Sequence, residues 1–196
     1  MCDNHIVTMY VQPLPDKEST MKTHKIILSF FAGLSLFVSG ASASSAFASK
    51  IAPMSFPWMN GPQSGATWNM ADNTNGVFVF EAFSLNCGWC NKNAVNVEAL
   101  ATKFKDNARV QVIDLGLDSS DSYYTRWIQT HKPNHPVVKD VGRKVYNALQ
   151  VENGIPQVFI VNCRGELEDV VVGYWESAEK AQVERAVNKA LQTTCN

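Results

Sequence analysis

Two cysteines separated by two residues, Cys87 and Cys90, carry the clearest chemistry in this chain of 196 residues. The apolar run at residues 77–83 precedes them, and its β-branched and aromatic composition predicts a buried strand. Residues 91–105 follow, with apolar side chains at helical spacing. The cysteines therefore lie where a strand passes into a helix, and the positive end of a helix dipole stabilises a thiolate there. We expect Cys87 at or near the N-cap and Cys90 one turn inside, as a dithiol that switches to a disulfide.

A Cys-x-x-Cys pair can also be half of a zinc site or a structural disulfide. Zinc needs two more ligands, and the sequence has no second Cys-x-x-Cys pair. His131 and His135 are four residues apart, but Pro133 between them prevents an ordinary helix from presenting both. A structural disulfide of this spacing closes a very small loop and constrains the unfolded chain little. Redox chemistry is favoured, and both alternatives stay open.

The first 48 residues differ from the rest and indicate a leader. Residues 1–20 are polar and precede a second methionine, Met21, so we interpret them as an over-long or non-native N-terminus. Residues 21–48 have a basic start, an apolar centre and small residues at the end, which predicts a secretory signal peptide cleaved after Ala48. The alternative is an uncleaved membrane anchor, although the apolar stretch is shorter than the roughly 18–20 residues that a spanning helix needs. Residues 49–196 then form one domain.

Charge and cysteine usage agree with export. The formal net charge is −1, which gives no indication of a nucleic acid or acidic membrane as partner. Four of the five cysteines follow residue 48, and an exported protein allows them to pair. A C-terminal helix that packs back along the sheet would bring Cys195 near the turn at residues 162–165, so Cys163 and Cys195 are candidates for a second, structural disulfide. The alternative is that Cys163 is a buried free thiol.

The remaining patterns predict an α/β domain. Further strands are expected at residues 109–117, 157–161 and 168–174. Further helices are expected at residues 119–129 and 141–151, and in a last helix capped by Ser177. Residues 50–75, rich in Pro, Gly, Asn and Ser, are expected to pack their aromatic side chains without much regular structure. The β-α-β order implies that the first two strands are parallel and joined by a right-handed crossover. The tight turn at residues 162–165 makes the last two strands antiparallel. The fold class is therefore α/β, with a central mixed sheet flanked by helices.

This order of elements resembles the thioredoxin fold over roughly residues 65–195. Four features carry the resemblance: Cys87-Gly88-Trp89-Cys90 at the strand–helix junction, Glu81 six residues before the first cysteine, Ile155-Pro156 where thioredoxins carry a cis-proline, and Gly173 near the end of the last strand. The insertion between Asp118 and Gly154 is similar to the exported TlpA-like branch, which includes membrane-tethered thiol reductases of cytochrome maturation. The resemblance implies a thioredoxin fold with a helical insertion before the cis-proline strand.

The resemblance also implies roles for individual residues. Cys87 would be the nucleophile and Cys90 would resolve the mixed disulfide. Glu81 would shuttle the proton that Cys90 loses, unless it is a structural carboxylate paired with a lysine or arginine. The substrate would meet Gly88, Trp89 and the backbone of Ile155 before a cis Pro156, where an extended segment can pair as an added strand.

Cofactors and partners follow from the same resemblance. No metal or organic cofactor is implied, because the cysteines carry the electrons. The implied partners are protein thiols and disulfides together with a membrane or periplasmic redox partner, and the protein is expected to be a periplasmic monomer.

Three residue choices depart from the family pattern. Asn86 replaces an aromatic residue, Gly88-Trp89 resembles the Gly-Tyr pair of exported disulfide isomerases, and the active-site helix lacks a proline. The sequence predicts an exported thiol–disulfide oxidoreductase that reduces or isomerises protein disulfides. Two alternatives remain open: a dithiol oxidase that introduces disulfides, and a non-enzymatic binding or metal-carrier module of the same fold.

Overall fold

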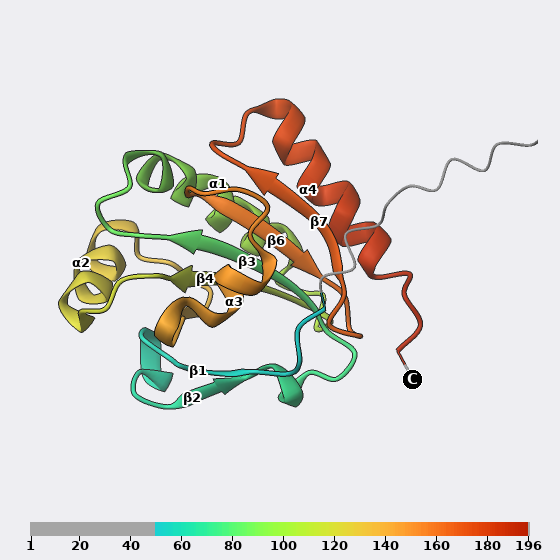
Figure 1. Ribbon diagram of the computed structural model, residues 1–196, viewed down its shortest axis with the longest axis horizontal. Helices are drawn as coiled ribbons and strands as arrows, with labels where there is room; N and C mark the ends of the chain where they lie inside the picture. The colour runs from blue at the N-terminus through green and yellow to red at the C-terminus, as the bar shows by residue number, and fades with distance from the viewer. Residues whose placement is uncertain (1–49, 196) are drawn as a thin grey trace, which may run out of the picture. The chain divides into compact units, whose positions relative to one another are not determined.

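The computed structural model describes residues 50–195, so the predicted N-terminal extension (1–20) and signal peptide (21–48) lie outside the described residues. A five-stranded sheet with strand order β5-β4-β3-β6-β7 forms the centre of the domain (Figure 1). Its strands are β3 (Val77–Phe83), β4 (Val110–Gly116), β5 (Val137–Lys139), β6 (Gln157–Val161) and β7 (Leu167–Val172). The helices are α1 (Gly88–Phe104), α2 (Asp121–His131), α3 (Lys144–Leu149) and α4 (Ser177–Ala190).

The sheet is mixed, as the sequence predicts. β3 pairs in parallel with β4, and β4 pairs in parallel with β5. β6 runs antiparallel to both β3 and β7. Every residue of β3 and β6 is buried, which explains why these segments are nearly continuous apolar runs in the sequence.

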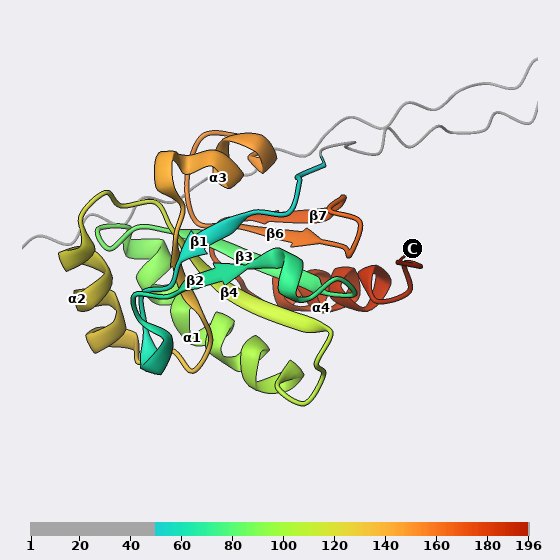
Figure 2. The same ribbon diagram turned by 90° about the horizontal axis from the view of Figure 1, so that it is seen from below.

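Two layers cover the two faces of the sheet. α1 and α4 lie on one face and α3 on the other (Figure 2). Side chains alternate along β3: Val77 and Val79 pack with α1 and α4, whereas Phe78 and Phe80 pack on the opposite side. Glu81 follows the same alternation and lies under α1, where Asn93 contacts it. The alternation of side chains along β3 therefore places a carboxyl group, and not an apolar side chain, beneath α1.

The segment at residues 50–75 differs from its prediction. It contains a two-stranded antiparallel hairpin of β1 (Ser55–Pro57) and β2 (Thr67–Asn69), followed by a short 3₁₀ turn. Phe56 and Trp68 lie opposite each other in the hairpin and are both buried against β3, so packing of two aromatic rings stabilises strands that the polar composition concealed. The expectation of aromatic packing is confirmed, and that of little regular structure is wrong.

The C-terminal helix also begins differently from its prediction. Ser177 is the first residue of α4, and Glu176 is the N-cap, in a reciprocal capping box with Glu179. Beyond the helix, Cys195 forms a disulfide with Cys163 in the β6–β7 connection, with Cα atoms 5.8 Å apart. None of the helices within residues 50–195 is both long enough and apolar enough to cross a membrane.

Candidate active site

Cys87 and Cys90 form a disulfide at the start of α1, with Cα atoms 5.2 Å apart. Cys87 is the N-cap, and its Sγ accepts a hydrogen bond of 3.0 Å from the backbone N–H of Cys90. Cys87 is partly exposed, whereas Cys90 is fully buried. An attacking thiol from solvent therefore reaches only the first sulfur, and the helix N–H group stabilises negative charge on that same sulfur.

The loop before the helix is held by side chains on both sides. The amide of Asn91 donates to the carbonyl oxygens of Leu85 (2.8 Å) and Cys87 (2.9 Å). The carboxylate of Asp118, just after β4, accepts from Ser84 Oγ at 2.8 Å and from the Leu85 N–H at 2.9 Å. These bonds connect the carboxyl ends of β3 and β4 to the N-terminus of α1, so the position of Cys87 does not depend on the disulfide alone.

The Ile155–Pro156 peptide bond is cis and lies beside the disulfide. The carbonyl oxygen of Ile155 is 3.6 Å from Cys87 Sγ, close enough to accept a hydrogen bond from that thiol once the disulfide is reduced. Gly173 at the end of β7 donates its N–H to the carbonyl oxygen of Pro156 at 2.9 Å, and its φ of +85° suits glycine. The Ile155–Pro156 segment thus contacts both Cys87 and the end of the last strand.

An exposed aromatic side chain borders the disulfide. Trp89 is 57% exposed, its ring centroid lies 5.9 Å from that of Tyr174, and Lys92 Nζ lies 4.3 Å above its ring. Gly88 beside it is also exposed. An exposed tryptophan next to a reactive sulfur provides apolar contact area for another protein.

Glu81 lies buried under α1, with 1% of its surface exposed. Its Oε1 accepts a hydrogen bond of 2.8 Å from Asn93, three residues after Cys90 on the same buried face of the helix. Asp114 lies directly opposite in β4. Burial, and then the charge of Asp114, raise the pKa of Glu81 well above its ordinary value. The structural alternative of a lysine or arginine partner is wrong, because no ion pair within residues 50–195 involves Glu81.

Two buried asparagines continue this polar cluster toward α4. Asn93 Oδ1 accepts from the side chain of Asn96 at 2.9 Å and from the Trp175 N–H at 3.2 Å. Asn96 also donates to the Trp175 carbonyl oxygen at 3.1 Å. The amide of Asn93 is therefore fixed in orientation, with its NH₂ group directed at Glu81.

Sequence reasoning missed several polar residues around Glu81, among them Asn93, Asp114 and His135. An acid at the centre of an apolar strand was a detectable signal for Asp114, because such strands seldom carry a charge without a partner. His135 was weighed only as a zinc ligand. Within residues 50–195 no cluster of three or more His, Cys, Asp or Glu side chains is arranged to hold a metal ion.

Solved structures with the same fold are numerous, and three are representative. A protein assigned as the thiol:disulfide interchange protein DsbE from Chlorobium tepidum is 20% identical, with a TM-score of 0.60 over 74% of this chain and 96% of that one. A protein assigned as a disulfide isomerase from Bacteroides thetaiotaomicron is 17% identical, with a TM-score of 0.63 over 74% and 90%. A secreted disulfide oxidoreductase from Mycobacterium tuberculosis is 13% identical, with a TM-score of 0.55 over 69% and 95%. The structural likeness shows that the chain shares their fold.

The family is established by sequence. No curated protein matches the chain. The model of the AhpC/TSA family matches residues 50–170, more than half of the chain, and the match includes both cysteines of the Cys-x-x-Cys pair and the cis-proline. The chain therefore belongs to the AhpC/TSA family, and it is a thiol–disulfide oxidoreductase of thioredoxin fold.

Proposed function

We propose that the protein is exported and reduces or isomerises disulfides in other proteins, with Cys87 as the nucleophile. One observation carries the proposal. Cys87 is the partly exposed N-cap of α1, and its sulfur accepts an N–H hydrogen bond and lies beside the Ile155 carbonyl oxygen. Its partner sulfur on Cys90 is inaccessible. This is the asymmetry that a nucleophile and a resolving thiol require.

The reducing half-reaction begins at Cys87. The Cys87 thiolate attacks a substrate disulfide, one substrate sulfur leaves as a thiolate, and a mixed disulfide forms. Cys90 then loses its proton and attacks Cys87 Sγ. The second substrate sulfur leaves with the electron pair, and the Cys87–Cys90 disulfide is restored. Two electrons pass to the substrate, whose two thiolates take up protons.

Glu81 supports the buried half of this cycle. Burial and the charge of Asp114 raise the pKa of Glu81 and so favour the neutral form of its carboxyl group. When a reductant attacks Cys87, Cys90 leaves as a thiolate in a buried environment, and Glu81 donates the proton that neutralises it. In the opposite direction the Glu81 carboxylate accepts that proton, as microscopic reversibility requires.

The surroundings of the dithiol favour reduction over oxidation. Strong oxidants stabilise their reduced, thiolate form. Here two carboxyl groups, Glu81 and Asp114, lie under the helix, and no cationic side chain within residues 50–195 is hydrogen-bonded to either sulfur. A buried Cys90 without a cationic neighbour is disfavoured as a thiolate, which makes the disulfide more stable relative to the dithiol and the dithiol more reducing.

Substrate binding is proposed at the rim of the site. An extended segment would pair with the backbone at Ile155, and an apolar side chain of the substrate would contact Trp89. Gly88 leaves space at the nucleophile because a Cβ there would meet no atom within 4 Å.

Export is proposed from the signal-like residues 21–48 and from the disulfide between Cys163 and Cys195, which an oxidising compartment permits. A related fold occurs in a secreted oxidoreductase. A periplasmic reductant would need a membrane or periplasmic partner to return it to the dithiol state.

The experiment is the equilibrium reduction potential of the Cys87–Cys90 pair in protein recovered from the export compartment, with its N-terminus sequenced. The expected value is nearer to the roughly −270 mV of thioredoxin than to the roughly −120 mV of the strong oxidants. An N-terminus at residue 49 supports export with cleavage. A value near that of the strong oxidants would assign the dithiol oxidase function instead, and a pair that does not cycle would exclude the enzyme function proposed here.

A further inference from the structure

A chain of buried ionisable groups leads from Glu81 to the surface, away from the substrate-binding rim. Asp114 lies beside Glu81 across β3 and β4. His135, in the loop before β5, has its Nε2 3.1 Å from Asp114 Oδ1 and its Nδ1 3.1 Å from Glu98 Oε2. Glu98 lies on α1 two turns beyond Cys90 and is 28% exposed, whereas the side chains of His135 and Asp114 are 5% and 3% exposed. The order Glu81, Asp114, His135, Glu98 thus runs from the interior to solvent.

The inner part of this chain contains buried polar atoms without a hydrogen-bond partner. These are Glu81 Oε2, Asp114 Oδ1 and His135 Nε2. Nε2 and Oδ1 are close enough to pair electrostatically, although the ring is not aligned for a linear hydrogen bond. Two adjacent carboxyl groups can bond to each other only when one of them carries a proton. Buried atoms of this kind are rare and require an explanation, and a proton held within the cluster supplies one.

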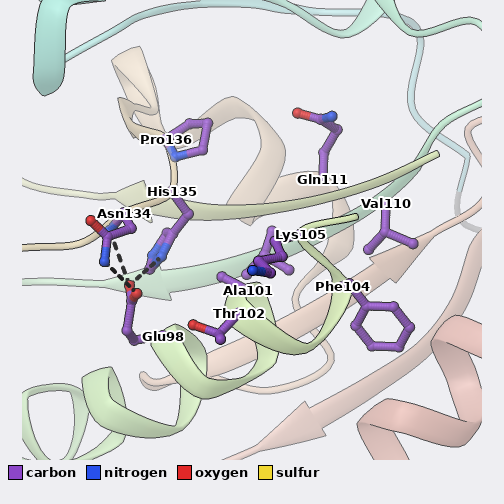
Figure 3. Close-up of a pocket in the computed structure, with 11 residues that line it drawn as sticks. Glu98, Ala101, Thr102, Phe104, Lys105, Val110, Gln111, Asn134, His135 and Pro136 are labelled. Atoms are coloured by element: carbon purple, nitrogen blue, oxygen red, sulfur yellow. Dashed lines mark hydrogen bonds and ion pairs between the residues drawn. The ribbon is translucent and has the colours of Figure 1, made fainter. Parts of the chain in front are cut away.

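The outer end opens into a pocket of about 400 Å³ between α1, β4 and the loop at residues 132–136 (Figure 3). Figure 3 shows Asn134 and His135 converging on the carboxylate of Glu98. Lys105 and Gln111 line the same pocket. His135 lines this pocket, so a small solute has access to its outer side, whereas Cys90 is fully buried.

Charges face His135 from every element packed around it. Glu81 and Asp114 lie on β3 and β4, Glu98 on α1, Lys105 just after α1, and His131 at the end of α2. Burial disfavours the charged form of His135, but the charges of Asp114 and Glu98 and the hydrogen bond between His135 Nδ1 and Glu98 outweigh it and raise the pKa of His135 above its ordinary value. Burial lowers the pKa of His131. An imidazole with a carboxyl group on each side is suited to pass protons in either direction.

We propose that Asp114, His135 and Glu98 form the route by which Glu81 exchanges its proton with solvent. The inference rests on the proposed function, since it concerns the proton that Glu81 gives to Cys90. After Glu81 protonates the Cys90 thiolate, His135 gives a proton to the Asp114 carboxylate, Asp114 passes one to Glu81, and His135 regains one from solvent through Glu98. One proton enters and one reaches the thiol, so no net charge stays in the core. These three are positioning residues that act through Glu81.

The test measures the rate at which a small dithiol reduces the Cys87–Cys90 disulfide in the whole exported protein, by quenching and thiol alkylation, from pH 5 to pH 9. His135→Ala is expected to slow this step about tenfold near neutral pH, within the range of general acid–base effects. Added imidazole should enter the open pocket and restore the rate in proportion to its concentration, without accelerating the wild type. Asn134→Ala is the matched control, because it removes a hydrogen bond to Glu98 at 2.9 Å but no titrating group.

Two further variants keep the proposal testable if His135→Ala folds poorly. His135→Gln is similar in size and forms hydrogen bonds but does not carry a proton at neutral pH, and Glu98→Gln changes only the exposed end. Both variants are expected to slow the step and to flatten its pH dependence. Their melting temperatures are expected to equal that of the wild type. A pH profile and rate equal to wild type in these variants would overturn the proposal. So would a slow His135→Ala variant that imidazole does not restore.

The two proposals fail in distinguishable ways. If the wild-type protein does not exchange disulfides with another protein, the proposed function fails, whatever the small dithiol reports. If it does exchange them and the His135 variants behave as wild type, only the proton route fails, and His135 serves to attach the β5 loop to α1.

Discussion

The two disulfides of this protein have the same covalent bond in two different environments. Cys87–Cys90 spans a sequence separation of 3 at the N-terminus of a helix, next to a cis-proline and above a buried acid. Cys163–Cys195 spans a separation of 32 and attaches the segment after α4 to the β6–β7 connection. A long closed loop constrains the unfolded chain, by about 3–4 kcal/mol for this separation, whereas the short one contributes about half as much.

The polar groups around the two disulfides also differ. Around Cys87, hydrogen-bonding groups can stabilise a thiolate, and the buried carboxyl group of Glu81 contacts Asn93 on the same helix. Around Cys195, the contact is with Arg109, whose guanidinium also donates to the carbonyl oxygens of Asn75 and Leu191. That arginine fixes the end of the chain. The comparison teaches that the neighbours of a disulfide, and not the presence of the bond, separate a redox function from a structural one.

The largest expected effect is on exchange. Cys87→Ser should reduce protein disulfide exchange by at least about a thousandfold, because Cys87 is the accessible sulfur of the Cys-x-x-Cys pair and accepts an N–H hydrogen bond at the start of α1. Cys90→Ser should instead accumulate mixed disulfides with substrates. Insulin reduction and non-reducing electrophoresis measure the two outcomes. Equal activity of Cys87→Ser and wild type would remove the distinction between the two disulfides.

Removal of the second disulfide should affect stability and leave the redox chemistry unchanged. Replacing both Cys163 and Cys195 by Ser should lower the free energy of unfolding by about 3 kcal/mol. The reduction potential of the Cys87–Cys90 pair should not change. Urea unfolding measures the free energy of unfolding, and thiol–disulfide equilibration measures the reduction potential. A shift in potential with no loss of stability would reverse the assignment of the two bonds.

Glu81→Gln should slow reduction of the buried sulfur by about a hundredfold, since the amide provides no titrating proton. It should also change the dependence of stability on pH. The pKa of Glu81 is raised in the folded protein above the roughly 4.3 of an unfolded glutamate, so the folded state binds a proton that the unfolded state releases.

The sign of the stability effect follows from this difference. Wild-type stability from Glu81 is fully present below about pH 4 and is lost as the pH rises through the raised value. Glu81→Gln should lack that loss, and unfolding titrations in urea from pH 4 to pH 9 compare the two proteins. Parallel curves would mean that Glu81 does not hold the proton.

The smallest expected effect concerns the rim. Trp89→Ala should change the free energy of unfolding by no more than about 0.5 kcal/mol, because the side chain is mostly exposed. It should raise the KM for a protein substrate several-fold while leaving reduction by a small dithiol unchanged. Val95→Ala, another exposed apolar residue of α1, is the matched control. Equal effects of the two substitutions would mean that Trp89 has no specific role in substrate contact.

Local pattern was sufficient for much of the fold. The strands at β3, β4 and β6 and the helix after Cys87 follow from apolar periodicity and from glycine and proline positions, and the structure confirms them. The boundaries that differ, such as Glu176 as N-cap, depend on side-chain hydrogen bonds that residue type alone does not decide. The hairpin at β1 and β2 was missed because two aromatic rings 12 residues apart stabilise it, against a composition typical of loops.

The redox pair itself was determined by the sequence, because a Cys-x-x-Cys pair at a strand–helix junction is a local arrangement with a local chemical consequence. The surroundings of Glu81 were decided only by the tertiary structure. Asn93, Asp114 and His135 come from a helix, a strand and a loop, and they meet because β3 pairs with β4 under α1. A carboxyl group that is ordinary in sequence is shifted toward its neutral form by burial and a neighbouring charge, and both are properties of packing across the sheet.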